Sequence, residues 1–403
     1  MSTVTTPAGM ARADLDALLG FGLSDEQWDC VSAPLEPFVI VAGAGTGKTT
    51  VMAARVLWLV ASGLVADHEV LGLTFTNKAA AELAHRIGTL LARWREVVPA
   101  DPVRVGEPTV ATYHSFARRL IDEQGLRVGI EPGARLLGGA AVAQLAHREV
   151  CRADGLVAVT GEPARVAQAV LRLDANLAEQ TISTDELRAH DRAAIAEIDA
   201  TVARPTKRVQ AIRGAARQRI ELAGLVDDLR AAKQRAGGLG FEDHMRLCVD
   251  LVRAGSEIVD TMRRTFRVIL LDEYQDTSIA QRVILSTLFG GCAVTAVGDP
   301  MQAIYGWRSA SVANIESFGA HFGRGGRAQV RVLGLNRRSG SQILGAANRI
   351  AAALRVHHPQ IATLRPPEPR EATVRAALLE TIADDTYAHY DEHLPALDAA
   401  AAG

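Results

Sequence analysis

The stretch Phe38-Val-Ile-Val-Ala42-Gly-Ala-Gly-Thr-Gly-Lys48-Thr49-Thr50 decides the fold of this chain. Its first five residues are apolar and rich in β-branched side chains, which predicts a buried strand. A glycine-rich turn ending in Lys-Thr follows, and the apolar run at 51–60 predicts a helix directly after it. A strand, such a turn and a helix in this order are typical of a phosphate-binding P-loop.

The residue types of this turn suit a nucleoside triphosphate with Mg²⁺. Glycines allow backbone N–H groups to face phosphates, Lys48 would reach the β- and γ-phosphates, and the Thr49 hydroxyl would ligate Mg²⁺. The usual pattern begins with glycine, and this chain has Ala42 there. The alternative is a strand-to-helix turn that binds nothing. The predicted nucleotide-binding residues of the turn are Ala42, Gly43, Ala44, Gly45, Thr46, Gly47, Lys48, Thr49 and Thr50.

A second motif is the apolar strand Val268-Ile-Leu-Leu, which ends in Asp272-Glu273. The carboxyl end of a strand in a parallel sheet faces the ligand crevice. Asp272 is suited to hold Mg²⁺, and Glu273 is suited to orient and deprotonate an attacking water. Alone, such a strand end is more often a simple turn, so this interpretation depends on the P-loop.

Apolar runs that alternate with helical patterns predict an α/β fold with a parallel sheet covered on both faces. From 131 to 240 no such run occurs, and the periodicity predicts an inserted all-helical subdomain. The predicted strands are 38–42, 70–75, 109–112, 267–271, 293–297 and 329–333.

Composition narrows the class of protein. A net charge of -2, from 46 acids against 44 bases, excludes a uniformly basic surface, so any nucleic-acid contact must be local. Four scattered cysteines suit a reducing cytoplasm better than disulfides or zinc. No apolar run reaches ~18 residues, and residues 1–12 lack the apolar core of a signal peptide. These features predict a cytoplasmic protein without a membrane span.

Three longer blocks resemble the superfamily 1 DNA helicases of the UvrD/Rep/PcrA type. They are Leu73-Thr-Phe-Thr-Asn-Lys78, Asp272-Glu-Tyr-Gln-Asp-Thr277 and Val297-Gly-Asp-Pro-Met-Gln302-Ala-Ile-Tyr305-Gly-Trp307-Arg308. The resemblance covers roughly residues 20–350. The sequence of the third block, together with the tyrosine at 274, is most similar to the AdnB-like helicase-nuclease subunits of actinobacteria. It implies a RecA-like lobe at 1–130 and 241–327, a helical subdomain at 131–240, a truncated second lobe at 328–383 and a disordered tail at 384–403.

The resemblance also implies roles at the nucleotide. Gln27 matches an adenine-reading glutamine, and with Ser24 three residues earlier it also fits a helix capping box. Gln302 matches a γ-phosphate sensor, and Arg338 matches an arginine finger. The family usually has tyrosine at position 337, where this chain has Arg337, whose planar guanidinium could stack on the base instead.

Further residues match family contacts to single-stranded DNA, where aromatic rings stack on bases. Core packing is the alternative for the two aromatic residues at 305 and 307, and a structural role is the alternative for the histidine at 114. The matching residues are Thr74, Thr76, Asn77, Lys78, Thr112, Tyr113, His114, Ser115, Tyr305, Trp307 and Arg308. A basic run in the helical subdomain could touch duplex DNA or simply be a solvated face; it comprises Arg204, Lys207, Arg208, Arg213, Arg217 and Arg219.

The function predicted from these features is ATP-dependent translocation on DNA, 3′ to 5′, with Mg²⁺, in DNA repair or recombination. Single-stranded DNA and single-strand/duplex junctions are the expected substrates, and other repair subunits are expected partners. Since the second lobe is incomplete, we expect weak ATP hydrolysis and no duplex unwinding by the chain alone. The alternatives are a non-catalytic subunit of a repair complex and a P-loop ATPase unrelated to nucleic acid.

Overall fold

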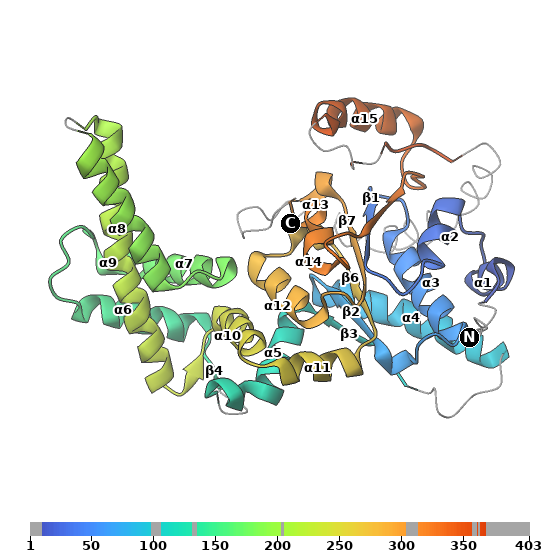
Figure 1. Ribbon diagram of the computed structural model, residues 1–403, viewed down its shortest axis with the longest axis horizontal. Helices are drawn as coiled ribbons and strands as arrows, with labels where there is room; N and C mark the ends of the chain where they lie inside the picture. The colour runs from blue at the N-terminus through green and yellow to red at the C-terminus, as the bar shows by residue number, and fades with distance from the viewer. Residues whose placement is uncertain are drawn as a thin grey trace, which may run out of the picture.

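The computed structural model describes residues 10–97, 106–130, 135–202, 205–303, 313–356, 361 and 363–367. Its centre is a six-stranded sheet with only parallel pairings, in the order β3-β2-β6-β7-β1-β8 (Figure 1). The strands lie within one residue of each predicted boundary. They are β1 (Phe38–Ala42), β2 (Val70–Thr74), β3 (Thr109–Thr112), β6 (Val268–Leu271), β7 (Ala293–Gly298) and β8 (Gln329–Leu333).

Two hydrophobic cores cover the two faces of the sheet, because successive strand residues point to opposite sides. Val39 and Val41 belong to one core, and Phe38 and Ile40 belong to the other. The first core is covered by α5 (Tyr113–Gln124), α10 (Phe241–Ala254), α11 (Ser256–Thr265), α12 (Ile279–Phe289) and α14 (Phe318–Phe322). The second is covered by α1 (Arg12–Leu19), α2 (Asp25–Val31), α3 (Lys48–Ala61) and α4 (Asn77–Val97).

The second lobe was predicted to begin at 328, but the strand that follows, β8, belongs to the first sheet. It pairs with β1 from Phe38↔Gln329 to Ala42↔Leu333, so it completes the first sheet instead of beginning a second one. Without it, β1 would present an unpaired edge of backbone donors and acceptors. The strand is followed by α15 (Ser341–Arg355), and the short α13 (Ala313–Glu316) precedes α14. The tail predicted at 384–403 lies outside the described residues.

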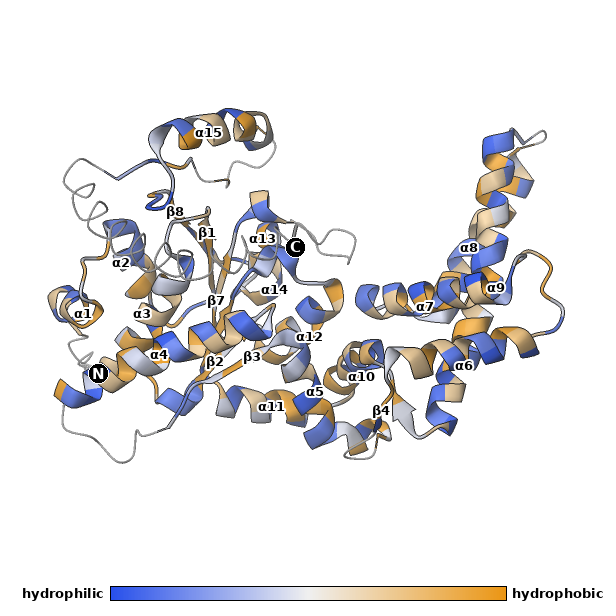
Figure 2. Cartoon of the chain, turned by 180° about the vertical axis from the view of Figure 1, so that it is seen from behind, coloured by the Kyte–Doolittle hydropathy of each residue, from blue (hydrophilic) through white to orange (hydrophobic). Residues whose placement is uncertain are grey.

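The predicted helical insertion extends to one side of the sheet (Figure 1). It has its own core, built by α6 (Gly139–Arg152), α7 (Pro163–Gln180) and α9 (Lys207–Arg235), while α8 (Thr184–Thr201) pairs with α9. In Figure 2, hydrophilic and hydrophobic residues are mixed along both α8 and α9. The insertion is not entirely helical, because β4 (Arg135–Leu136) and β5 (Gly238–Leu239) pair where the chain leaves and returns. Two-residue strands are too short to produce a periodic pattern.

Two arginines of the basic run hold the α8–α9 pair together. Arg219 contacts the fully buried Asp191 at 2.6 Å, and Arg213 contacts Asp199 at 2.8 Å. Lys207, Arg208 and Arg217 are exposed, whereas the residue at 204 lies outside the described part of the chain. The run is therefore partly structural.

Arg55 interrupts the apolar face of α3 for a structural reason. Its guanidinium is fully buried and donates to the carbonyl oxygens of Val31, Ala33 and Pro34 at 2.7–3.0 Å. It thereby ties the segment between α2 and β1 to the helix that follows the P-loop. Burial lowers the pKa of Arg55 to about 9. Within the described residues, none of the helices combines the length and apolar character that crossing a membrane requires.

Candidate active site

The motifs predicted from the sequence meet at the carboxyl edge of the parallel sheet. The P-loop follows β1, the acid pair follows β6, and residues 299–302 follow β7. The segment at 75–78 follows β2, and residue 113 follows β3. Loops at this edge of an open α/β sheet usually bind the ligand, and the sheet topology places these motifs at that one edge.

The P-loop has the backbone geometry that its glycines permit. Gly45 and Gly47 have φ of 74° and 86°, in the left-handed region that favours glycine. Gly47 is the N-cap of α3, so Lys48 is the first residue of the helix. Thr46 donates its hydroxyl hydrogen to the Gly43 carbonyl at 2.8 Å, which closes the turn. Thr50 accepts a hydrogen bond from Arg86 of α4 at 3.2 Å.

The P-loop lysine reaches the acid pair. Lys48 Nζ lies 3.4 Å from Glu273 Oε2, although the two residues are 225 positions apart in the sequence. Glu273 has φ 48° and ψ 44°, a left-handed conformation that costs a non-glycine residue about 1–3 kcal/mol. Such strain, held in place at the end of a strand, is typical of functional sites.

Asp272 is positioned by the sheet itself. Its N–H donates to the Leu73 carbonyl at 2.9 Å, and its Oδ1 accepts the N–H of Glu273 at 3.0 Å. Burial and then the charge of Glu273 raise the pKa of Asp272 to about 6, against the opposing effect of Lys48. A hydroxyl at Thr49 and a carboxylate at Asp272 are the hard oxygen donors that Mg²⁺ accepts, and phosphates and water supply its remaining ligands.

Asp272→Asn is expected to remove a pH dependence from folding stability. Since the pKa is raised in the folded state, folding favours the protonated carboxyl. That contribution is complete below 3.8, the ordinary pKa, and is lost as pH rises through about 6. Without nucleotide or Mg²⁺, the wild type should therefore lose stability relative to Asp272→Asn between about pH 4 and pH 7. Urea denaturation at several pH values measures this difference, and a constant difference would contradict it.

Two buried polar side chains, Gln275 and Asp299, connect Glu273 to Gln302 by hydrogen bonds. Neither side chain was predicted from the sequence. Gln275 donates to Glu273 Oε2 at 2.7 Å and accepts the N–H of Asp299 at 3.0 Å. Asp299 Oδ2 in turn accepts from Gln302 Nε2 at 2.6 Å. At Gly298, a Cβ would lie 2.7 Å from Gln275 Oε1, so only glycine permits this approach. The signal available in the sequence was that Gln275 and Asp299 lie inside the quoted motifs.

The other residues predicted at the nucleotide lie against the P-loop. Gln27 completes the capping box with Ser24 and also donates from Nε2 to the Thr46 carbonyl at 3.0 Å. The N–H of Arg337 donates to the Gly45 carbonyl at 2.8 Å. A Cβ on Gly45 would lie 2.6 Å from the Cβ of Arg338. The capping box expected at Gln27 is thus confirmed. Its adenine-reading role stays a prediction.

A cavity of about 370 Å³ brings together the two loops predicted to contact DNA. Besides predicted residues, it is lined by Phe75 and by Phe241, whose side chain is 54% exposed. The Phe241 ring stacks on His114 with centroids 4.8 Å apart. Sequence reasoning missed both phenylalanines, although Phe75 stands inside a quoted motif. The predicted residues that line the cavity are Thr76, Asn77, Thr112, His114 and Ser115.

Thr74 and Tyr113, which were predicted to contact DNA, have buried side chains whose hydroxyl groups bond inside the protein, and a DNA contact at these positions stays a prediction. Thr74 is fully buried, and its hydroxyl donates to the Thr76 carbonyl at 3.1 Å. Tyr113 lies in the core, and its hydroxyl donates to the Asp272 carbonyl at 2.9 Å. Burial raises the pKa of Tyr113. The Thr74 hydroxyl supports the turn between β2 and α4, and the Tyr113 hydroxyl supports the backbone that follows β6.

The remaining predicted DNA contacts divide into two groups. Lys78 is exposed on the first turn of α4. Tyr305, Trp307 and Arg308 lie outside the described residues.

A second cavity, of about 440 Å³, shares Phe75 and Phe241 with the first and extends toward α7 of the helical insertion.

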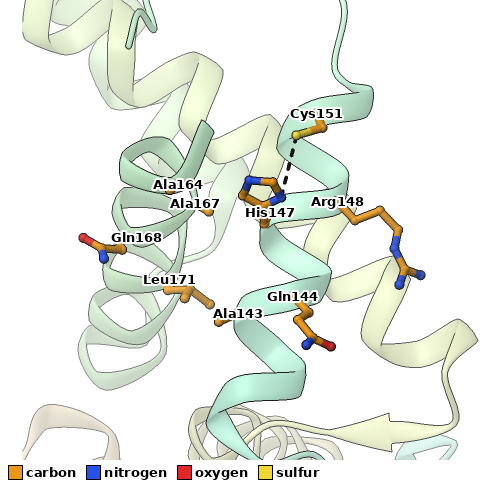
Figure 3. A pocket seen from close by; sticks show the side chains of 9 residues that line it. All are labelled: Ala143, Gln144, His147, Arg148, Cys151, Ala164, Ala167, Gln168 and Leu171. Carbon is orange, nitrogen blue, oxygen red and sulfur yellow. Dashed lines mark hydrogen bonds between the residues drawn. The ribbon is translucent and has the colours of Figure 1, made fainter. Parts of the chain in front are cut away.

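A separate cavity of about 660 Å³ lies between α6 and α7, away from the carboxyl edge of the sheet (Figure 3). There, Cys151 Sγ lies 3.7 Å from His147 Nδ1 one helical turn earlier. A search of the described residues finds no group of three or more His, Cys, Asp or Glu that could hold a metal ion.

A P-loop after one strand and an acid pair after another, joined across a parallel sheet, define the class of P-loop nucleotide-binding proteins. Residues 23–323 match the UvrD/REP helicase N-terminal domain, and the chain belongs to this family. The finer assignment to AdnB-like proteins stays a prediction.

Comparison with characterised proteins gives the same family. The chain is 30% identical over 369 residues to the ATP-dependent DNA helicase UvrD1 of Mycobacterium leprae, covering 87% of this chain and 42% of the relative. It is 30% identical over 340 residues to DNA helicase II of Haemophilus influenzae, with coverages of 84% and 41%. It is 27% identical over 337 residues to the ATP-dependent DNA helicase PcrA of Staphylococcus aureus, with coverages of 83% and 40%. The chain thus spans about two fifths of the length of these relatives.

Proposed function

We propose that this chain binds ATP with Mg²⁺ at the carboxyl edge of the sheet and hydrolyses it when single-stranded DNA occupies the adjacent cavity. The observation that carries the proposal is the meeting of Lys48 and Glu273 beside the P-loop. The names of the relatives, which are ATP-dependent DNA helicases, support the same chemistry.

The chain's own residues account for the steps of hydrolysis. The P-loop N–H groups and the Lys48 ammonium would hold the phosphates, and Thr49 and Asp272 would hold Mg²⁺, which would offset phosphate charge during transfer. Glu273 would orient a water and take its proton while the water oxygen bonds to the γ-phosphorus and the bond from that phosphorus to the bridging oxygen breaks, so that ADP and phosphate leave. When phosphates arrive, Lys48 exchanges its contact with Glu273 for them, which frees the carboxylate to act as a base.

The polar chain from Glu273 through Gln275 and Asp299 to Gln302 gives a physical route between hydrolysis and DNA. Its last member precedes residues 305–308, which resemble a DNA-contacting loop of the family. We propose that γ-phosphate at Gln302 alters this hydrogen-bonded chain. The resemblance further implies 3′ to 5′ translocation, action at single-strand/duplex junctions in DNA repair, and other repair subunits as partners. Because this chain spans two fifths of its relatives, we expect it not to unwind duplex DNA alone.

The decisive experiment measures phosphate release from Mg·ATP with and without a single-stranded oligonucleotide. We expect release that single-stranded DNA stimulates and that duplex DNA of the same sequence stimulates less. ATP hydrolysis without DNA stimulation would favour a P-loop ATPase unrelated to nucleic acid. ATP binding without any hydrolysis would favour a non-catalytic subunit. Robust unwinding by this chain would contradict the expectation that it needs further domains.

Phe241→Ala is expected to weaken binding of single-stranded DNA about tenfold, because stacking on one base is worth ~1–3 kcal/mol. The ring is half exposed beside His114 and Phe75, in the cavity that the two predicted DNA loops share. Fluorescence anisotropy of a labelled oligonucleotide measures the affinity. Phe21→Ala is a matched control, because Phe21 is also exposed (40%) but lies near α1. Equal affinities of the two variants would argue against stacking at Phe241.

A further inference from the structure

Four successive carbonyl groups of the P-loop, at residues 43–46, accept hydrogen bonds. Besides the bond within the turn from Thr46 to the Gly43 carbonyl, three bonds come from distant segments. Asn336 Nδ2 donates to the Ala44 carbonyl, the N–H of Arg337 donates to the Gly45 carbonyl, and Gln27 Nε2 donates to the Thr46 carbonyl. Four successive carbonyls therefore have fixed directions.

These bonds also fix the N–H groups that would face a phosphate. In a trans peptide the C=O and the following N–H point in opposite directions, and the described residues contain no cis peptide. A partner that holds the Ala44 carbonyl therefore holds the Gly45 N–H on the opposite side of the chain. The same applies to each of the four peptide units, which together form an anion-binding concavity of backbone N–H groups.

Asn336 acts at both ends of its side chain. Its side chain is 1% exposed, and while Nδ2 contacts the P-loop, Oδ1 accepts the N–H groups of Arg338 at 2.9 Å and Ser339 at 2.8 Å. One buried amide therefore joins the phosphate loop to the turn that carries Arg338. Close packing reinforces the contact, since a Cβ on Gly45 would collide with Arg338.

The turn is anchored from its other side by α2. Glu26 Oε2 accepts the N–H groups of Gly334 at 2.9 Å and Leu335 at 3.3 Å, and Glu26 Oε1 lies 3.3 Å from an Arg365 nitrogen. Because Gln27 follows Glu26 directly, the first turn of α2 holds both the P-loop and the segment that carries Asn336. The contact with Asn336 is thus part of a rigid connection between β1, β8 and α2.

We propose that Asn336 is a positioning residue, which holds the P-loop N–H groups toward a phosphate and keeps the turn of Arg338 beside them. This role deepens the proposed function and rests on it for its ligand. The ligand recognised is the polyphosphate group and not the base, since the contacts all concern the phosphate loop. Asn336 itself touches no reacting atom.

Two variants separate the two ends of the amide. Asn336→Asp keeps an oxygen for the Arg338 and Ser339 N–H groups but presents a second oxygen to the Ala44 carbonyl. Asn336→Ala removes both ends. Asn314→Asp is the matched control, because Asn314 is similarly buried and donates to a backbone carbonyl, that of Thr277, away from the P-loop.

Hydrogen exchange of the nucleotide-free protein measures directly how well the backbone N–H groups of the P-loop are held. We expect faster exchange of backbone amides at residues 44–47 in both Asn336 variants, and faster exchange at residues 338–339 only in Asn336→Ala. Asn314→Asp should leave both segments unchanged. Wild-type exchange at residues 44–47 in Asn336→Asp would overturn the proposal, as would equal acceleration in the control.

Affinity for Mg·pyrophosphate, measured by calorimetry, gives the functional readout without a base. We expect it to fall on the order of tenfold in Asn336→Asp and Asn336→Ala, the effect of losing a buried hydrogen bond. The Ala variant is needed because the Asp variant adds a charge that repels phosphate. Unchanged affinity in Asn336→Ala would overturn the role of Asn336 while leaving the proposed function intact. Failure of the wild type to bind either Mg·pyrophosphate or Mg·ATP would instead refute the proposed function. In that case, the hydrogen-exchange experiment alone would test the positioning role of Asn336.

Discussion

Glu273→Gln is expected to lower DNA-stimulated phosphate release by about 10² to 10⁴-fold, the usual contribution of a general base. The substitution keeps the size of the side chain and an oxygen that can accept from Gln275, but the amide cannot take a proton from water. Binding of Mg·ATP should persist, because Lys48 and the P-loop are unchanged. A stopped-flow assay of phosphate release and a separate binding titration distinguish the two effects.

Glu257→Gln provides the control for this experiment. Glu257 lies on α11, is exposed at its surface, and pairs with Arg127. The same change of charge there should leave phosphate release at the wild-type rate. If Glu273→Gln retained more than about a tenth of the wild-type rate, Glu273 would not be the general base.

Lys233→Met is expected to destabilise the chain by about 3–5 kcal/mol, because it leaves buried carboxylates without their partner. Lys233 is 3% exposed at the end of α9. Its ammonium lies 3.0 Å from Asp174 of α7 and 2.8 Å from Asp243 of α10. This ion cluster therefore connects the helical insertion to the helix that begins with Phe241. Urea denaturation followed by circular dichroism measures the loss.

Lys207→Met on the same helix is the matched control. Lys207 is exposed at the start of α9, so its substitution should change the free energy of unfolding by less than about 0.5 kcal/mol. A loss below about 1 kcal/mol for Lys233→Met would show that Arg230, which also contacts Asp174, compensates for the missing charge. That result would contradict the central place assigned to Lys233.

At the carboxyl edge of the sheet, local sequence patterns were enough to predict the strands and the meeting of Lys48 with the acid pair. The apolar runs at β1 and β6 are long enough to identify buried strands, and the residues after them are chemically distinctive. Because parallel strands end at a common edge, knowing the strands is enough to bring Lys48 toward Glu273. The distance of 3.4 Å between their charged groups agrees with that argument.

Local patterns were insufficient where one residue type or strand pattern suits two environments. Tyr113 suits a DNA contact and a core hydroxyl equally, and its burial depends on the packing of α5 against β2, β3 and α10, which no neighbouring residue specifies. β8 has the pattern of any edge strand, and its assignment to the first sheet depends on pairing with β1, almost 300 residues earlier. Asn336 and Lys233 gave no signal of their own, since Asn336 holds the Ala44 carbonyl and Lys233 pairs with Asp174, both distant in the sequence.

By itself, the sequence determined the strands, the phosphate turn, the acid pair and the helical insertion, because short-range periodicity and residue chemistry specify each of them. Tertiary structure alone decided which sheet β8 joins, which polar side chains are buried, and how Asn336 and Gln27 hold the carbonyls of the P-loop. Those features depend on hydrogen bonds and burial between distant segments. Such contacts leave no local pattern, because either partner alone is compatible with many environments.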